Sequence, residues 1–281
     1  MTTFEGPAES ACEAVRLAGL RPLDVNPVLR LPYDAARVAA AGAALEGAPD
    51  DARRLLLHHA LSAAVLVVAT TTTAADGTET TRRVRIGLDP IGPTVESVPE
   101  AGTAPGTGSL ADMVTRAGDA TRRWQDIEPR SLVPAAVSVL PEGEQWRARA
   151  RLTPASQAES VRLTPSQQEA VVAALAAGGS ARSAVAPLED VDPILRDALG
   201  ASGPRTAVTL SRHDPSGRLL SEPSLWTRMW VVGEHGLCRL DPEGAGTTVS
   251  RVEPGDVLGT IVAMLGQGLE FTTALTMASA R

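Results

Sequence analysis

The side chains with the most chemical potential in this sequence are its four histidines and two cysteines, and their spacing decides what each can do. His58 and His59 are adjacent in a segment with helical periodicity. Their rings therefore point about 100° apart and cannot chelate one metal ion, as two histidines spaced by four residues can. We interpret both as core or surface histidines.

The other two histidines each stand beside a carboxylate. His213-Asp214 and Glu234-His235 fall in predicted turns, and no serine lies in the G-x-S-x-G context of a nucleophile. Cys238 follows His235 by three residues, which places the two side chains on opposite faces of a strand. These neighbours therefore do not predict a nucleophile with its base.

Two further patterns resemble binding motifs without meeting their requirements. Cys12 and Cys238 stand alone, without a CxxC pair, so we expect free thiols that behave as small buried hydrophobes. The glycine-rich segment 102–108 lacks the lysine of a phosphate-binding loop and is interpreted as a linker. The sequence therefore predicts no catalytic, cofactor-binding or metal-binding residue, no cofactor, and a protein that is not an enzyme.

Arginine and tryptophan supply the remaining candidates for binding. One basic strand face is expected at Arg82, Arg83 and Arg85, and a second at Arg147, Arg149 and Arg151. Either could grip a carboxylate or an acidic partner, but we favour solvated charges on edge strands, which block aggregation. Trp226 and Trp230 lie four apart on one predicted strand, hence on one face, and are more typical of a core than of a ligand platform.

Composition limits the class of protein. The chain has 281 residues, of which 43% are hydrophobic and only 2% aromatic, so we expect an aliphatic core. The net charge is −7, and all 26 basic residues are arginine, which argues against a dedicated nucleic-acid binder. No run of about 20 apolar residues predicts a membrane span, and residues 1–20 lack the apolar core of a signal peptide. A cytoplasmic protein without membrane insertion is expected.

The elements that would position these residues alternate between helices and antiparallel strands. Asp76-Gly77 joins two β-prone runs, which predicts a hairpin, and Thr164-Pro165-Ser166-Gln167 is a capping box that opens a helix. Helices are expected at 31–45, 49–61, from 109, from 164, at 192–199 and from 254, and strands at 65–73, 80–88, 94–98, 146–152, 205–211, 225–232 and 247–252.

Two segments of the chain resemble each other. Leu88-Asp89-Pro90 and the later Thr94-Val95 match Leu240-Asp241-Pro242 and Thr248-Val249, and each set precedes a helix. An alternative is that Leu-Asp-Pro is common turn chemistry. We predict one α+β domain, internally duplicated about a pseudo-two-fold axis, with antiparallel sheet and flanking helices. Its halves would span about 12–125 and 130–270, followed by a tail at 271–281.

Over roughly residues 12–268 the chain resembles the EspG family, the cytoplasmic chaperones of type VII secretion systems. The resemblance lies in length, in the duplicated α+β pattern, in the Ala- and Arg-rich composition, and in the strand ending Trp230-Val231-Val232-Gly233-Glu234-His235-Gly236 before a final helix. It implies a helical partner of the PE/PPE type, whose apolar tip the chaperone covers. The family's partner-binding residues cannot be matched to positions here, so none is assigned.

Two other functions compete with a secretion chaperone. One is an enzyme of unknown class with a cleft between the two halves, which would bring together His213, Asp214 or Glu234 in a deep pocket. The other is a non-catalytic interaction domain. Neither the identity of a partner nor an oligomeric state follows from the sequence.

Overall fold

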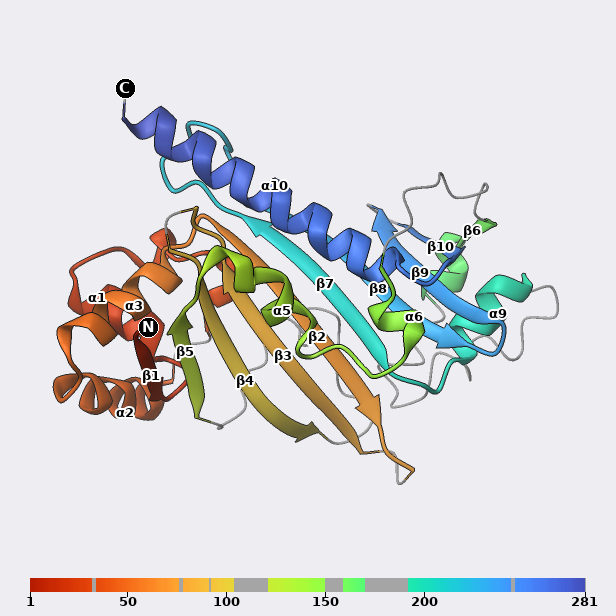
Figure 1. Ribbon diagram of the computed structural model, residues 1–281, viewed down its shortest axis with the longest axis horizontal. Coiled ribbons are helices and arrows are strands. Elements are labelled where there is room, and N and C mark those ends of the chain that lie inside the picture. The colour runs from red at the N-terminus through yellow and green to blue at the C-terminus, as the bar shows by residue number, and fades with distance from the viewer. Residues whose placement is uncertain are drawn as a thin grey trace.

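The computed structural model describes residues 1–31, 34–75, 78–90, 92–103, 121–149, 159–169, 192–243 and 246–280. They form one antiparallel sheet of ten strands with flanking helices, which confirms the predicted α+β class (Figure 1). In spatial order the strands are β1 (Thr3–Gly6), β5 (Arg122–Asp126), β4 (Thr94–Thr103), β3 (Glu79–Gly87), β2 (Ala64–Thr73), β7 (Arg205–Arg212), β8 (Ser224–Gly233), β9 (Gly236–Glu243), β10 (Gly246–Val252) and β6 (Ser160–Arg162).

Helices cover both faces of this sheet. They are α1 (Ser10–Leu17), α2 (Ala35–Glu46), α3 (Asp50–Ala60), α5 (Leu132–Val137), α6 (Glu144–Arg147), α9 (Pro193–Gly200) and α10 (Asp256–Ser279), with 3-10 turns η1 (Pro22–Asp24), η2 (Pro27–Leu29) and η3 (Pro129–Ser131). Successive strand residues point to opposite faces. On β2, Leu66 and Val68 pack in the core under α5, α6 and α10, whereas Val65 and Val67 pack in the core under α1 and α3. A third core lies between α9 and strands β8 to β10.

The two halves of the sheet have the same topology. From the centre outward, the strands follow the order β2-β3-β4-β5-β1 in one half and β7-β8-β9-β10-β6 in the other. β2 pairs with β7 in the middle, and each begins a four-strand meander that runs to one edge of the sheet. The short strands β1 and β6, which precede these meanders in the chain, close the two edges by pairing with β5 and β10. The halves thus share a topology, although a duplication of sequence is not confirmed by it.

The residue match that suggested a duplication does not align equivalent elements. Leu88-Asp89-Pro90 forms the connection after β3, whereas Leu240-Asp241-Pro242 lies inside β9 and pairs with β10. β9 itself was not predicted, because its Asp-Pro pair is typical of turns. The two matched segments are therefore not structurally equivalent, because one is a connection and the other is part of a strand.

Several predicted elements are confirmed. β2 and β3 form the expected hairpin, paired from Val65 opposite Gly87 to Thr73 opposite Glu79, while its turn residues 76 and 77 lie outside the described residues. The capping box has both of its bonds: the Gln167 side chain accepts from the Thr164 amide at 2.9 Å, and the Gln167 amide donates to the Thr164 hydroxyl at 3.3 Å. The predicted helix from 109 falls on residues that the structure does not describe.

Two predictions at the level of elements are wrong. Residues 146–149 are not a strand: the chain forms the helical turn α6 there, because Trp146 turns into the core, where it is 3% exposed. The predicted tail is also wrong in its described part: residues 271–279 are helical, since α10 continues to Ser279, and Thr272 is buried. Leu269 and Phe271 pack against the main core, and the hydroxyls of Thr272 and Thr276 donate to backbone carbonyls one turn earlier in the helix.

α10 is the one described helix that is long and apolar enough to cross a membrane. Its inner face packs in the main core through Val257, Ile261, Met264 and Leu265, which accounts for its hydrophobicity. At Gly268 the helix comes so close to the sheet that a Cβ atom would overlap the Leu88 side chain and lie 3.2 Å from Leu210. A partly buried helix of this kind is consistent with a soluble protein.

Candidate functional site

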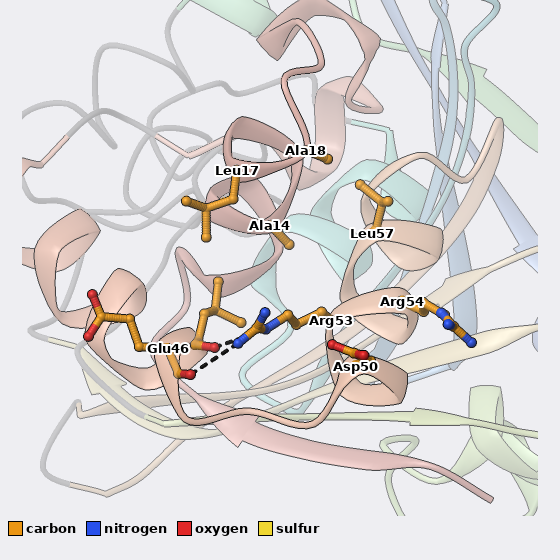
Figure 2. A pocket seen from close by; sticks show the side chains of 9 residues that line it. Ala14, Leu17, Ala18, Glu46, Asp50, Arg53, Arg54 and Leu57 are labelled. Carbon is orange, nitrogen blue, oxygen red and sulfur yellow. Dashed lines mark hydrogen bonds between the residues drawn. The ribbon is translucent and has the colours of Figure 1, made fainter.

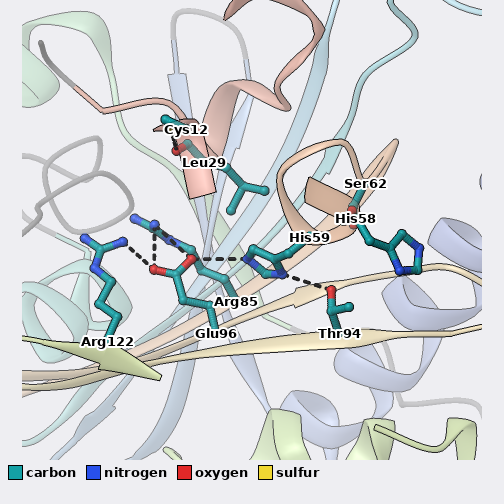
Figure 3. A network of polar contacts seen from close by, with 9 residues as sticks. All are labelled: Cys12, Leu29, His58, His59, Ser62, Arg85, Thr94, Glu96 and Arg122. Carbon is teal, nitrogen blue, oxygen red and sulfur yellow. Dashed lines mark hydrogen bonds and ion pairs between the residues drawn. The ribbon is translucent and has the colours of Figure 1, made fainter. Parts of the chain in front are cut away.

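The two adjacent histidines lie in different environments. His58 is partly exposed, with Nε2 3.3 Å from the Asp89 carboxylate. His59 is fully buried, and its two ring nitrogens contact the Thr94 hydroxyl at 2.9 Å and the Glu96 carboxylate at 3.2 Å (Figure 3). His58 and His59 therefore have no contact partner in common among these residues. Within the described ranges, no group of three or more His, Cys, Asp or Glu side chains could hold a metal ion.

Glu96 is the centre of a buried polar cluster between α3 and the sheet. Its carboxylate accepts from Arg85 at 3.2 Å and from Arg122, and all three side chains are no more than 3% exposed (Figure 3). Burial alone would raise the pKa of Glu96, but the two guanidinium groups and His59 outweigh burial and hold this pKa well below its ordinary value. The cluster ties α3 to β3, β4 and β5. Because it is closed to solvent, it offers no substrate access.

The residues proposed for an enzyme cleft are not brought together. His213 follows β7 and Glu234 follows β8, and these strands are antiparallel neighbours, so the two residues lie at opposite ends of a ten-residue strand, about 30 Å apart. Asp214 accepts hydrogen bonds from Ser216 and from the Leu219 amide. Burial opposes ionisation, but these bonds lower its pKa to about 2. Asp214 therefore stabilises its own turn.

The basic strand faces were interpreted wrongly. β3 is an interior strand between β2 and β4, and Arg83 and Arg85 on it are 4% and 1% exposed, so they are not solvated edge charges. Only Arg82, on the opposite face, is exposed. The second group is not a strand at all. The Arg147 side chain donates to the carbonyls of Leu140 and Pro141 and closes the α6 turn, and residue 151 lies outside the described ranges.

The remaining candidates are the two tryptophans and the two cysteines, and their contacts are within the fold. Trp230 is fully buried, and its indole Nε1 donates to Asp256 at 2.8 Å, which holds the start of α10 against β8. Trp226 is partly buried under the Arg228 guanidinium, 4.8 Å from the ring centre. Both cysteines are free thiols: Cys238 is buried, and Cys12 donates to the Leu29 carbonyl at 3.5 Å.

A groove of about 540 Å³ lies between α1 and the hairpin of α2 and α3 (Figure 2). Its apolar wall comes from α1, α2 and α3, and its rim is charged. The lining residues are Ala14, Leu17, Ala18, Leu45, Leu57, Glu46, Asp50, Arg53 and Arg54. Arg53 donates to the carbonyls of Leu45 and Glu46, so the α2–α3 connection that forms the rim is held in place. An apolar groove with a charged rim suits an apolar segment of another protein.

Three exposed leucines lie in the α1 wall of the groove or shortly after it in the chain. Leu17 is 57% exposed, Leu20 39% and Leu23 67%, within seven residues that follow the groove wall. Two more exposed leucines lie far away in the chain: Leu219, in the loop between β7 and β8, is 43% exposed, and Leu225, in β8, is 60% exposed. We call these five residues the leucine surface.

Two long-range hydrogen bonds join the chain segments that carry the two groups of leucines. His213 Nε2 lies 2.9 Å from the Leu23 carbonyl, and the Ser211 hydroxyl donates to the Asn26 side chain at 2.7 Å. Leu225 lies directly opposite Ser211 across the β7–β8 pair. Burial lowers the pKa of His213, which keeps the ring neutral at this junction. The leucines were not identified from the sequence, because each lies in a segment that has no motif.

No protein-family model and no curated protein matches the sequence. The surface of the described residues combines a groove, a charged rim and five exposed leucines, whereas the polar clusters are either buried or used within turns.

Proposed function

We propose that the protein is a cytosolic chaperone or adaptor of type VII secretion, similar to the EspG family, and that it binds a helical PE/PPE-type substrate. The observation that carries this proposal is the leucine surface beside the α1–α3 groove. Exposed apolar side chains on a soluble protein cost free energy unless a partner covers them. Leu17 lines the groove, and the bonds of His213 and Ser211 hold together the segments that carry the other leucines, which favours such a site, whereas scattered apolar residues would need no explanation.

The chemistry of the surface fits an apolar helical tip. The apolar wall of the groove would cover aliphatic side chains, and the rim residues Glu46, Asp50 and Arg54 offer both signs of charge to polar residues around that tip. The two halves of the sheet have the same strand order from the centre to the edge. This shared order supports the resemblance to a chaperone family with pseudo-two-fold symmetry. The residues named for an enzyme cleft do not favour that alternative, since His213 and Glu234 lie at opposite ends of a strand.

A co-purification experiment tests this function. The tagged full-length protein would be produced together with a PE/PPE-type pair encoded in a type VII gene cluster of the same genome. We expect the pair to be recovered with the wild-type protein and to be lost with the double variant Leu20→Asp, Leu23→Asp. Recovery of the pair with this variant would contradict the proposed surface.

The control variant is Val262→Asp. Val262 is 49% exposed on α10, so its replacement changes a comparable apolar surface residue outside the leucine surface. We expect this variant to recover the pair as the wild type does. If no PE/PPE-type pair from the genome is recovered with the wild-type protein, the proposed function is wrong.

A further inference from the structure

The groove between α1 and the α2–α3 hairpin carries two carboxylates that have no partner among the described residues. Glu46 and Asp50 line the groove, and both are exposed. The arginines of the rim already have acceptors within the chain. Arg53 donates to two backbone carbonyls at the end of α2 (Figure 2), and Arg54 pairs with Asp51 at 3.5 Å. The charges that the rim leaves for a partner are therefore acidic.

The stability of α2 does not explain the position of Glu46. Glu46 is the last residue of α2, and the C-terminal end of a helix carries a partial negative charge that makes an acidic side chain unfavourable there. Asp50 lies in the first turn of α3, where an acidic side chain is favourable, but Asp51 beside it gives the same benefit. A positive charge from a partner would remove the cost at Glu46.

The α3 wall of the groove changes from apolar to acidic along the helix. Its lining residues are spaced by three, four and seven positions and so share one face of α3: Asp50, Arg53, Arg54 and Leu57. At a rise of about 1.5 Å per residue, Asp50 and Leu57 lie about 10 Å apart along the axis. Across the groove, α1 presents the small side chains of Ala14 and Ala18, which let another helix come close.

We infer that Glu46 and Asp50 select a partner helix that carries a lysine or arginine within two turns of the aliphatic residue that packs against Leu57. A helix that lies in a groove uses side chains spaced by three, four and seven positions, and two turns span about 10 Å. The long side chain of lysine or arginine can lay its apolar stem along the wall while its charge reaches the carboxylates. Only the choice of a helical partner rests on the proposed function.

Two synthetic helical peptides test this charge preference without the natural partner. They share one leucine face and differ only at the positions that flank it, which are lysine in one peptide and glutamate in the other. Fluorescence anisotropy would give the Kd of each labelled peptide for the full chain at low ionic strength. We expect the lysine peptide to bind about fivefold more tightly, because exposed ion pairs strengthen binding modestly and like charges weaken it. Equal affinity for the two peptides, or binding of neither, would overturn the inference.

Variants place the preference at the groove. In the double variant Glu46→Gln, Asp50→Gln the two peptides should bind with the same affinity. The control Glu253→Gln, Glu270→Gln changes the net charge equally at two exposed carboxylates outside the groove, and it should keep the preference. Leu17→Asp should weaken both peptides, since Leu17 lines the groove. A preference for lysine that persists without the two groove carboxylates would contradict their role.

The natural partner separates this inference from the proposed function. We expect Glu46→Gln, Asp50→Gln to raise the Kd for the PE/PPE-type pair, whereas Glu253→Gln, Glu270→Gln should not. Unchanged affinity of the groove variant for a pair that the wild type binds would overturn the inference and leave the proposed function standing. A lysine preference in the peptides, with no binding of the pair by the wild type, would contradict the proposed function alone.

Discussion

The imidazole Nε2 of His213 lies 2.9 Å from the backbone carbonyl of Leu23, although 190 positions separate the two residues in the chain. This contact joins the loop after β7 to the η1 turn, and it thereby brings the two groups of exposed leucines to the same end of the sheet. The ring is 7% exposed, so the bond is sheltered from competing water. The proposed partner site depends on this junction more than on any single leucine.

Replacing His213 by alanine should loosen the junction. Loss of one sheltered hydrogen bond costs about 0.5–1.5 kcal/mol of unfolding free energy, which urea denaturation would measure. His235→Ala is the control, since that side chain is 65% exposed at the opposite end of β8 and should change stability little. Equal effects of the two substitutions would contradict the role of His213.

The same contact predicts a pH dependence. Burial lowers the pKa of His213 below its ordinary 6.5, so the folded state favours the neutral ring. The contribution of His213 to stability is therefore complete above pH 6.5, and it is lost as the pH falls from there toward the lower folded-state pKa. The difference in unfolding free energy between the wild type and His213→Ala should shrink from pH 7.5 to pH 5.5. A constant difference would show that burial does not shift this pKa.

Glu96→Gln should destabilise the protein by about 3–5 kcal/mol, because it removes the negative charge from a buried ion pair while the cations remain. The pKa of Glu96 is held well below 4.5, so its ionised form stabilises the fold above that pH, and this stabilisation is lost as the pH falls toward the folded-state pKa. The variant should therefore lose less stability than the wild type between pH 5 and pH 3. Glu128→Gln, in an exposed pair with Arg130, is the control and should change little.

Two glycines of α10 should respond in opposite directions to alanine. Gly268→Ala forces a methyl group against Leu88 and Leu210 and should cost about 1–3 kcal/mol. Gly266→Ala meets nothing within 4 Å and removes a glycine from a helix interior, so it should stabilise by about 0.5–1 kcal/mol. Thermal unfolding followed by circular dichroism would measure both. A neutral Gly268→Ala would contradict the close approach of α10 to the sheet.

Elements with a clear local sequence signal were predicted correctly. The alternation around Val84 and Ile86 identified the β2–β3 hairpin, and the capping box at Thr164 identified a helix start. β9 was missed because Asp241 and Pro242 are typical of turns, yet both pair in register with β10. β1, β5 and β6 were missed because strands of three to five residues carry too little alternation to detect.

The candidate site could not be predicted because it depends on tertiary contacts. Leu23 and Leu225 are unremarkable as single residues, and only the pairing of β2 with β7 and the bonds of His213 and Ser211 join the segments that carry them. The buried state of Arg83 and Arg85 has the same origin, since strand order decides whether β3 is an edge or an interior strand.

Hydrogen exchange of the complex tests the partner site most directly. The protein would be labelled in deuterated buffer alone and with its co-produced PE/PPE-type pair, and peptides would be compared by mass spectrometry. We predict slower exchange in the complex at residues 14–24 and 213–225, with no change at the exposed β8–β9 turn at residues 233–236. Protection confined to other segments, with residues 14–24 and 213–225 unchanged, would contradict the leucine surface as the partner site.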